Sequence, residues 1–340
     1  MKKFYTAILI FMAFIKLNAQ DIHFSQYNAQ PIFLNPAFTG LNGCDYRAGA
    51  IYKSQWGSVS AGNTYRTTSA FADFAMGKPT KFSNFAGIGL SLFSDQAGDL
   101  NYNTNRAELS LAYHLMLNRN ATQSLSFGLQ GGFNHRGIDQ SRALFDFDPI
   151  TGEPIQSSIE NLERDPMFWG GVNAGILYSI SPNQNTNYFL GASFHHVNQP
   201  NISSFNVNRL ASERMFMKFT LHGGSLIPLT DVLSIMPGFM IANQGPHLEV
   251  NISNFFKFKT NSMPYNKTAF YFGTMYRVGD ALVLATRADF NNGLSIHFGY
   301  DLNISKLTAA SRLNGGPEIA VLFNGCFNRK NNDRYCPQGL

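Results

Sequence analysis

The chain has 340 residues, of which 14% are charged, and it contains 31 Phe and 14 Tyr. Average globular proteins carry about 25% charged residues, so this composition indicates a surface built for something other than bulk water. The formal net charge of +5 falls to about +2 once the three lysines of the leader are removed, which gives no reason to expect a nucleic-acid partner.

Residues 1–19 have the organisation of a secretory signal peptide. Lys2 and Lys3 form a basic start, residues 4–15 are apolar, and residues 17–19 (Leu-Asn-Ala) offer small side chains at the expected cleavage site. No cysteine follows this site, so lipid-anchored export is not expected. Beyond residue 20 we find no run of about 18 apolar residues, and we expect no membrane-spanning helix in the mature chain.

Residues 20–45 are expected to form a turn-rich plug or periplasmic segment. The stretch DIHFSQY, residues 21–27, precedes PIFLNPAFTG, residues 31–40. The prolines and the closing glycine favour turns over a strand or a long helix, while the aromatic side chains need burial. The mouth or lumen of the barrel predicted below offers that burial, so we interpret this segment as an N-terminal plug.

Beyond residue 45 large apolar residues alternate with small or polar ones. Positions 109, 111, 113, 115 and 117 are Leu, Leu, Tyr, Leu and Leu, separated by Ser, Ala, His and Met. A period of two is typical of strands with one apolar face. We expect about fourteen strands, near 46–56, 64–75, 85–94, 106–117, 124–135, 168–179, 187–197, 214–227, 232–242, 247–256, 269–277, 281–290, 294–303 and 317–324.

These segments predict an all-β fold, a transmembrane antiparallel β-barrel of the outer membrane over residues 46–325. A soluble sandwich also alternates, but the leader, the strand lengths and the polar inward faces favour the barrel. With both termini in the periplasm, the longest connections, 136–167, 198–213 and 304–316, lie outside. The inner side receives mostly short turns, the linker at 257–268 being the exception.

Three cysteines gather at one predicted rim. Cys44 lies just before the first strand and Cys326 just after the last, and these two strands are neighbours in a closed barrel. Cys336 lies in the expected periplasmic tail, residues 326–340. An exported chain meets an oxidising compartment, so we expect one disulfide here. Which pair forms stays open, and three free thiols are the alternative.

Several motifs together resemble a known family. DIHFSQY at 21–27, LNPAFTG at 34–40, YKSQW at 52–56 and a Cys-Pro pair at 336–337 are similar to the PorP/SprF family of type IX secretion-system membrane proteins, over essentially the whole mature chain. The Asn-Pro-Ala turn also resembles the hatch of FadL-like barrels. The closing CPQGL departs from the family's basic-aromatic end. The motif residues are Asp21, His23, Phe24, Ser25, Gln26, Tyr27, Asn35, Pro36, Ala37, Gly40, Gln55 and Trp56.

The resemblance implies an outer-membrane protein that works with the type IX apparatus, in some members in gliding motility. It implies as partners a secreted protein with a type IX C-terminal sorting domain, often an adhesin, and periplasmic, outer-membrane or cell-wall-linked components of the machinery, besides outer-membrane lipid. The barrel would help to export that protein or hold it at the surface. The alternative is a FadL-like channel for small or hydrophobic solutes.

Charged residues inside the predicted strands should face the lumen. An Arg facing mid-bilayer lipid costs roughly 2–4 kcal/mol. Because both signs are present and a plug needs something to grip, we prefer a cross-lumen ion network to a channel lining. These residues are Arg47, Arg66, Glu108, Glu249, Arg287, Asp289 and Asp301.

The sequence predicts no enzyme, cofactor or metal site. His195 and His196 are adjacent, so on a strand they face opposite sides, one the lumen and one the rim, and cannot hold one metal ion together. No cysteine pair has zinc-site spacing and no Gly-x-Ser-x-Gly elbow is present. The acidic loop is better interpreted as a solvated partner-binding loop than as a calcium site. Its candidate residues are Asp139, Asp146, Asp148 and Glu153.

Overall fold

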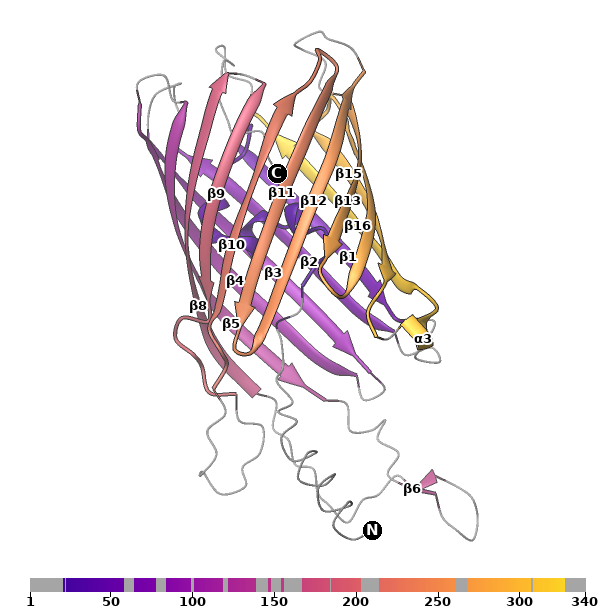
Figure 1. Cartoon of the computed structure of the whole chain (residues 1–340). Coiled ribbons are helices and arrows are strands. Elements are labelled where there is room, and N and C mark those ends of the chain that lie inside the picture. The colour runs from indigo at the N-terminus through magenta and orange to yellow at the C-terminus, as the bar shows by residue number, and fades with distance from the viewer. Residues whose placement is uncertain are drawn as a thin grey trace.

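The alternating segments pair into a closed antiparallel barrel in the computed structural model (Figure 1). None of the helices among the described residues is long and apolar enough to cross a membrane. The structure describes residues 21, 23–57, 64–77, 84–98, 101–118, 122–138, 146–147, 154–155, 167–183, 185–202, 214–260, 268–306 and 308–327.

Fourteen strands form the barrel within the described residues, which confirms the predicted fold class and strand number. Each strand pairs with the next one along the chain, and β1 closes on β16, where Tyr46 lies opposite Gly325. The barrel strands are β1 (Tyr46–Gln55), β2 (Tyr65–Met76), β3 (Phe85–Ala97), β4 (Tyr102–Met116), β5 (Gln123–Gly137), β8 (Met167–Asn183), β9 (Thr186–His195), β10 (Lys218–Pro228), β11 (Leu233–Gln244), β12 (His247–Lys259), β13 (Ala269–Arg277), β14 (Ala281–Asp289), β15 (Leu294–Asn303) and β16 (Asn314–Gly325).

The remaining elements are short. β6 (Asp146–Phe147) and β7 (Pro154–Ile155) form a separate two-stranded sheet in the connection between β5 and β8. Among the described residues the helices are η1 (Tyr27–Ala29), α2 (Pro31–Leu34), η2 (Pro36–Phe38) and α3 (Thr308–Ser311). Three of these four helices precede the first barrel strand, as the prolines and turn residues of this segment lead one to expect.

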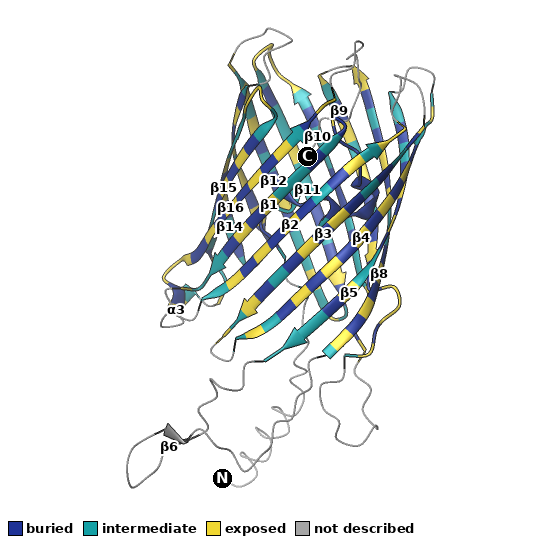
Figure 2. Ribbon diagram, turned by 180° about the vertical axis from the view of Figure 1, so that it is seen from behind, coloured by how far each residue is buried: buried dark blue, intermediate teal, exposed yellow. Residues whose placement is uncertain are grey.

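The barrel is apolar outside and polar inside, the reverse of a water-soluble domain. On β4, Leu109 and Leu111 are about half exposed, at 51% and 50%, whereas Ser110 and His114 are fully buried. Figure 2 shows this alternation as exposed and buried bands crossing the strands. An outward apolar surface and an inward polar one are what a barrel embedded in lipid requires.

The strands define two rims. We call the end where β1 begins and β16 ends the terminal rim, and the opposite end the distal rim. The connections β5–β8, β9–β10 and β15–β16, which include the three longest predicted loops, all join strands at the distal rim. Their placement on one side of the barrel is therefore confirmed.

Several strands extend past the apolar alternation that predicted them. β4 begins at Tyr102 instead of 106, because Asn103 and Asn105 continue the ladder with β3, where Asn103 pairs Gln96 and Asn105 pairs Ser94. β10 is shorter than expected and begins at Lys218. Backbone pairing, not side-chain polarity, decides where a strand ends, so alternation predicts the membrane-facing part best.

The N-terminal segment threads the lumen, and we call residues 21–45 the plug. Figure 1 shows its helices inside the barrel wall. Asp21 contacts Arg106 and Gln244 in the distal half, while the Asp45 N–H donates to the Gly325 carbonyl at the terminal rim. Asp21 and Cys326 thus lie toward opposite ends of the barrel. The expectation that both chain ends share one rim does not hold for Asp21, because the plug passes through the lumen.

Candidate functional site

Asn35 ties the middle of the plug to three wall strands. Its Oδ1 accepts the Ala37 N–H at 2.8 Å and so caps η2. Its Nδ2 lies 3.0 Å from the Ile176 carbonyl oxygen, 3.2 Å from that of Ala192 and 3.0 Å from His222 Nε2. The proline that follows has no N–H and a fixed φ, so the Asn-Pro-Ala turn holds this amide against the wall.

Gly40 marks the point where the plug turns onto the wall near the terminal rim. Its φ of +74° suits glycine, and its N–H donates to Asp73 Oδ2 at 2.7 Å. The same carboxylate receives both Nε (3.1 Å) and Nη2 (2.8 Å) of Arg47. Arg47 Nη2 also donates to the Phe38 carbonyl, so one buried bidentate ion pair binds wall and plug together.

The wall is recessed where the plug crosses it. A Cβ atom at Gly128 would lie 2.2 Å from the Ala37 nitrogen, and one at Gly175 would lie 1.9 Å from Asn35 Oδ1. Both distances are far below van der Waals contact. The plug backbone therefore occupies space that only glycines in the facing strands leave free.

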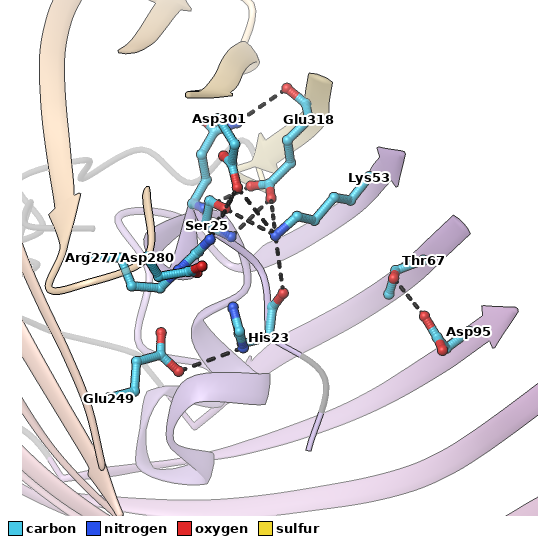
Figure 3. A network of polar contacts seen from close by, with 11 residues as sticks. His23, Ser25, Lys53, Thr67, Asp95, Glu249, Arg277, Asp280, Asp301 and Glu318 are labelled. Atoms are coloured by element: carbon cyan, nitrogen blue, oxygen red, sulfur yellow. Dashed lines mark hydrogen bonds and ion pairs between the residues drawn. The ribbon is translucent and has the colours of Figure 1, made fainter. Parts of the chain in front are cut away.

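The distal half of the plug is bound by a buried ion network (Figure 3). Ser25 Oγ donates to Asp301 Oδ2 at 2.7 Å and accepts from Lys53 Nζ at 2.9 Å and Arg277 Nη1 at 3.1 Å. Lys53 lies 3.6 Å from Asp301 and 3.8 Å from Glu318. Each of these side chains is nearly inaccessible to solvent, so removing one charge would leave its partners buried and uncompensated.

Glu318 binds the plug backbone directly. Its two carboxylate oxygens accept the N–H groups of Ser25 (2.9 Å) and Gln26 (2.7 Å). The Gln26 side chain returns a hydrogen bond to the Glu318 carbonyl at 3.2 Å. A plug segment without regular secondary structure thus has its backbone donors satisfied by one wall residue.

Asp21 forms the distal end of the described plug. Its carboxylate lies 2.5 Å from Arg106 Nη2 and 2.6 Å from His196 Nε2, and its N–H donates to Gln244 Oε1. Burial alone would raise the pKa of this carboxyl, but Arg106 and His196 outweigh burial and hold the pKa well below its ordinary value. Asp21 is therefore an anion at neutral pH.

His23 and Tyr27 are held uncharged inside the barrel. Burial, reinforced by Arg277 and Lys53, lowers the pKa of His23 well below its ordinary value. Burial raises the pKa of Tyr27 to about 12 against the effect of its 2.9 Å hydrogen bond with Ser253. Both side chains pack as neutral polar groups, and neither carries charge near pH 7.

An aromatic cluster fills the space beside this network. The Phe24 ring meets those of Phe33 and Phe93 edge-on at 6.0 and 6.1 Å, and Phe33 stacks on Phe93 at 5.5 Å. Ala29 and Ile32 of the plug pack into the same buried cluster. The plug therefore combines apolar burial with polar bonding. The burial of its aromatic residues is what the sequence led us to expect.

At the terminal rim a disulfide joins Cys44 to Cys326, with a Cα–Cα distance of 4.6 Å. It links the end of the plug to the residue after β16, across the seam where the barrel closes. Of the pairings that the sequence left open, this is the one in the structure. Cys336 lies outside the described residues.

The inward-facing charges follow the prediction with one exception. The side chain of Arg66 lies on the outer face, donating to Thr64 Oγ1. It is the second residue of β2 at the distal rim, where an outward Arg can reach water instead of lipid. The partly or fully buried predicted charges are Arg47, Glu108, Glu249, Arg287, Asp289 and Asp301.

The prediction that His195 and His196 face opposite sides was wrong. β9 ends at His195, and His196 has a φ of +56°, which turns its ring back into the lumen toward Asp21. His195 is also buried, beside the Leu34 carbonyl. Alternation holds only while the strand continues, and here it stops between the two residues.

Other inward-facing charges were missed by sequence reasoning. On each strand they occupy the same alternate positions as the small and polar residues that face the lumen. This alternation is the sequence signal that would have identified them. They are Lys53, Asp73, Arg106, Arg277 and Glu318.

The remaining predicted site residues either lie outside the plug segment or are not among the described residues. Trp56 packs edge-on against Tyr65 at 5.1 Å beside Gln55 at the distal rim. Asp139, Asp148 and Glu153 lie outside the described residues, as does the leader, and of Asp146 only the backbone is described. No group of three or more His, Cys, Asp or Glu side chains in the described part of the chain is arranged to hold a metal ion.

Fold and site together define a transmembrane β-barrel whose lumen is crossed by its own N-terminal segment. The chain belongs to the PorP/SprF family, because the profile of the family described as type IX secretion system membrane protein PorP/SprF matches residues 16–323. It is therefore an outer-membrane component of type IX secretion. No curated protein sequence matches the chain.

A solved structure supports the FadL-like fold. The toluene transporter TbuX of Ralstonia pickettii superimposes with a TM-score of 0.52 at 10% identity, covering 87% of this chain and 93% of that one. The P. putida toluene transporter TodX gives a TM-score of 0.45 at 8% identity, covering 86% and 93%. At such identities the likeness concerns the fold alone.

Proposed function

We propose that this barrel is a closed adaptor of the type IX machinery, which helps to export one secreted protein or holds it at the cell surface. The observation that carries the proposal is the bound plug. A lumen crossed by Asn35, Ser25 and Asp21, each bonded to the wall, offers binding surfaces at the rims instead of an open path. The proposal includes no catalytic step.

In this proposal the distal rim faces outward and the terminal rim faces the periplasm. The long connections then meet the secreted protein, with its type IX C-terminal sorting domain, outside the cell. The candidate contacts on the β5–β8 connection are Asp139, Asp146, Asp148 and Glu153. The terminal rim, where the Cys44–Cys326 disulfide lies, would contact periplasmic or cell-wall-linked components.

The test is purification of the tagged barrel from its native outer membrane in mild detergent, with mass spectrometry of proteins recovered in near-equal amount. We expect one secreted protein with a C-terminal sorting domain. A variant lacking residues 140–160 should still assemble but recover much less of that protein. A barrel recovered alone, with solute uptake lost in a deletion strain, would overturn the proposal in favour of a solute channel.

A further inference from the structure

A second feature of the distal rim lies beside the ion network. A pocket of about 350 Å³ opens among the distal ends of β1, β12, β13, β14, β15 and β16. This volume is at the lower end of the range for small-ligand sites. Its polar lining includes His23, Gln55, Glu249, Arg277, Asp280 and Asp301.

The pocket carries excess negative charge. Its lining includes the carboxylates Glu249, Asp280 and Asp301 but one cation, Arg277. The next charged contacts are Lys53 and Glu318, which balance each other, and Lys218, a further cation that acts on His23. His23 adds no charge, since its pKa is lowered by burial and by the adjacent cations. With these neighbours included, four carboxylates face three cations, so the region keeps one negative charge in excess.

Two carboxylate oxygens in the pocket have no hydrogen-bond partner among the described residues. They are Oδ1 of Asp301, a residue only 1% exposed, and Oε1 of Glu249. Glu318, by contrast, uses both of its oxygens to accept backbone N–H groups. A buried carboxylate oxygen without a donor costs free energy, and a donor arriving from outside would recover it.

We propose that this pocket binds a basic side chain, a lysine ammonium or an arginine guanidinium, presented by the secreted partner at the distal rim. The inference rests on the proposed function and names the chemistry of one contact within it. A cationic donor would neutralise the excess negative charge and would also donate hydrogen bonds to the unpartnered oxygens. Figure 3 shows the carboxylates of Glu249, Asp280 and Asp301 around Arg277 and Ser25, the region that the side chain would enter.

The test uses N-acetyl-lysine amide and N-acetyl-arginine amide as probes, with N-acetyl-norleucine amide as the uncharged control. Binding to the full-length barrel in detergent is followed by calorimetry at low ionic strength. We expect the cationic probes to bind about tenfold or more tightly than the norleucine probe, and added salt to weaken them. Equal affinity of all three probes, or no binding of any, would overturn the inference.

Glu249→Gln keeps the size of the side chain and removes its charge, and should weaken the lysine probe by about tenfold. Asp231→Asn, on the exposed turn between β10 and β11 at the other rim, is the matched control and should bind as the wild type does. Should Glu249→Gln not fold, Asp280→Asn replaces it, because Asp280 lies in an exposed turn. An unchanged affinity in the folded variant contradicts the site.

Two further outcomes separate this inference from the proposed function. If the probes do not bind while the secreted protein still co-purifies, the pocket inference fails and the adaptor function stands. If putrescine binds as tightly as the lysine probe and no protein co-purifies, the pocket serves a free diamine, and both the partner assignment and the adaptor function fail.

Discussion

Cys44 and Cys326 are 282 residues apart in the sequence, yet their disulfide bridges the seam where the first and last strands of the barrel meet. The bond lies beside two hydrogen bonds that span the same seam. The Asp45 N–H donates to the Gly325 carbonyl, and the Phe327 N–H donates to Asp45 Oδ2 at 2.7 Å. Covalent and hydrogen bonds together fix the end of the plug to the seam.

We expect Cys326→Ser to lower the free energy of unfolding by about 2–5 kcal/mol, because the cross-link closes most of the chain into one loop and restricts the unfolded state. The measurement is the heating temperature at which the compact band of the folded barrel disappears from SDS gels that are run in the cold. We expect this transition temperature to be lower for the variant. Cys336→Ser is the control, since it leaves the Cys44–Cys326 bond in place. Equal transition temperatures for Cys326→Ser and the wild type would contradict the prediction.

Lys53→Met should loosen the distal half of the plug. Lys53 is 1% exposed and lies within 4 Å of both Asp301 and Glu318, so its loss leaves two buried carboxylates short of a cation, at a cost of about 3–5 kcal/mol. Limited proteolysis should cut the plug of this variant well before that of the wild type.

A double-mutant cycle distinguishes charge from packing in that result. Combining Lys53→Met with Glu318→Gln restores the charge balance, so the double variant should be more stable than the sum of the single effects predicts. Additive effects of the two changes would show that the Lys53 ammonium and the Glu318 carboxylate are not coupled, and would contradict the charge explanation.

The sequence predicted the wall of this barrel better than its contents. A period of two follows directly from strand geometry, so residues such as Leu109 and Ser110 could be assigned to opposite faces without knowing any neighbour. Arg66 and His196 escaped the rule at strand ends. At the end of a strand an outward side chain can reach water instead of lipid, as Arg66 does, and a turn can follow the strand, as at His196. The alternation of faces then no longer determines where a side chain points.

The plug could be recognised from the sequence but its contacts could not. Prolines and aromatic residues showed that residues 31–40 turn and need burial, whereas the partners of Asn35 are more than 140 residues away in the chain. No local feature of the sequence indicates contacts between residues so far apart in the chain. The recessed glycines are similar: Gly128 appears in the sequence as one more small lumen residue, and only the folded barrel shows Ala37 against it.

Acid should weaken the distal end of the plug. The pKa of Asp21 is lowered in the folded protein, so its contribution to stability is complete above the unfolded carboxyl pKa of about 3.9 and is lost as pH falls through the folded value. The transition temperatures of the wild type and Asp21→Asn should therefore differ at pH 7, begin to approach each other below about pH 4 and meet only once the pH is below the folded pKa. A constant difference across this range would contradict the ion-pair role of Asp21.

Gly128→Val should displace the plug without disturbing the wall. A Cβ at this position would lie 2.2 Å from the Ala37 nitrogen, which the backbone cannot accommodate, and the cost is of order 1–3 kcal/mol or more. We expect normal barrel assembly with a protease-sensitive plug. Gly131→Val is the matched control on the same strand, because a Cβ there would meet only the Gly171 oxygen at 3.7 Å. Equal protease resistance of the two variants would contradict the predicted clash.

The plug inside the lumen leads to a prediction about ion flow. With residues 21–41 in place, planar-bilayer recordings of the wild type should show no large steady current. Deleting residues 21–41 removes Asp21, Ser25 and Asn35 but keeps Cys44 and all the described barrel strands, so a lumen lined by polar side chains should conduct. The comparison has a built-in control, since both proteins can be checked for assembly in the same gels. A large current from the intact chain would mean that the plug does not seal the barrel, and would return a channel function to first place.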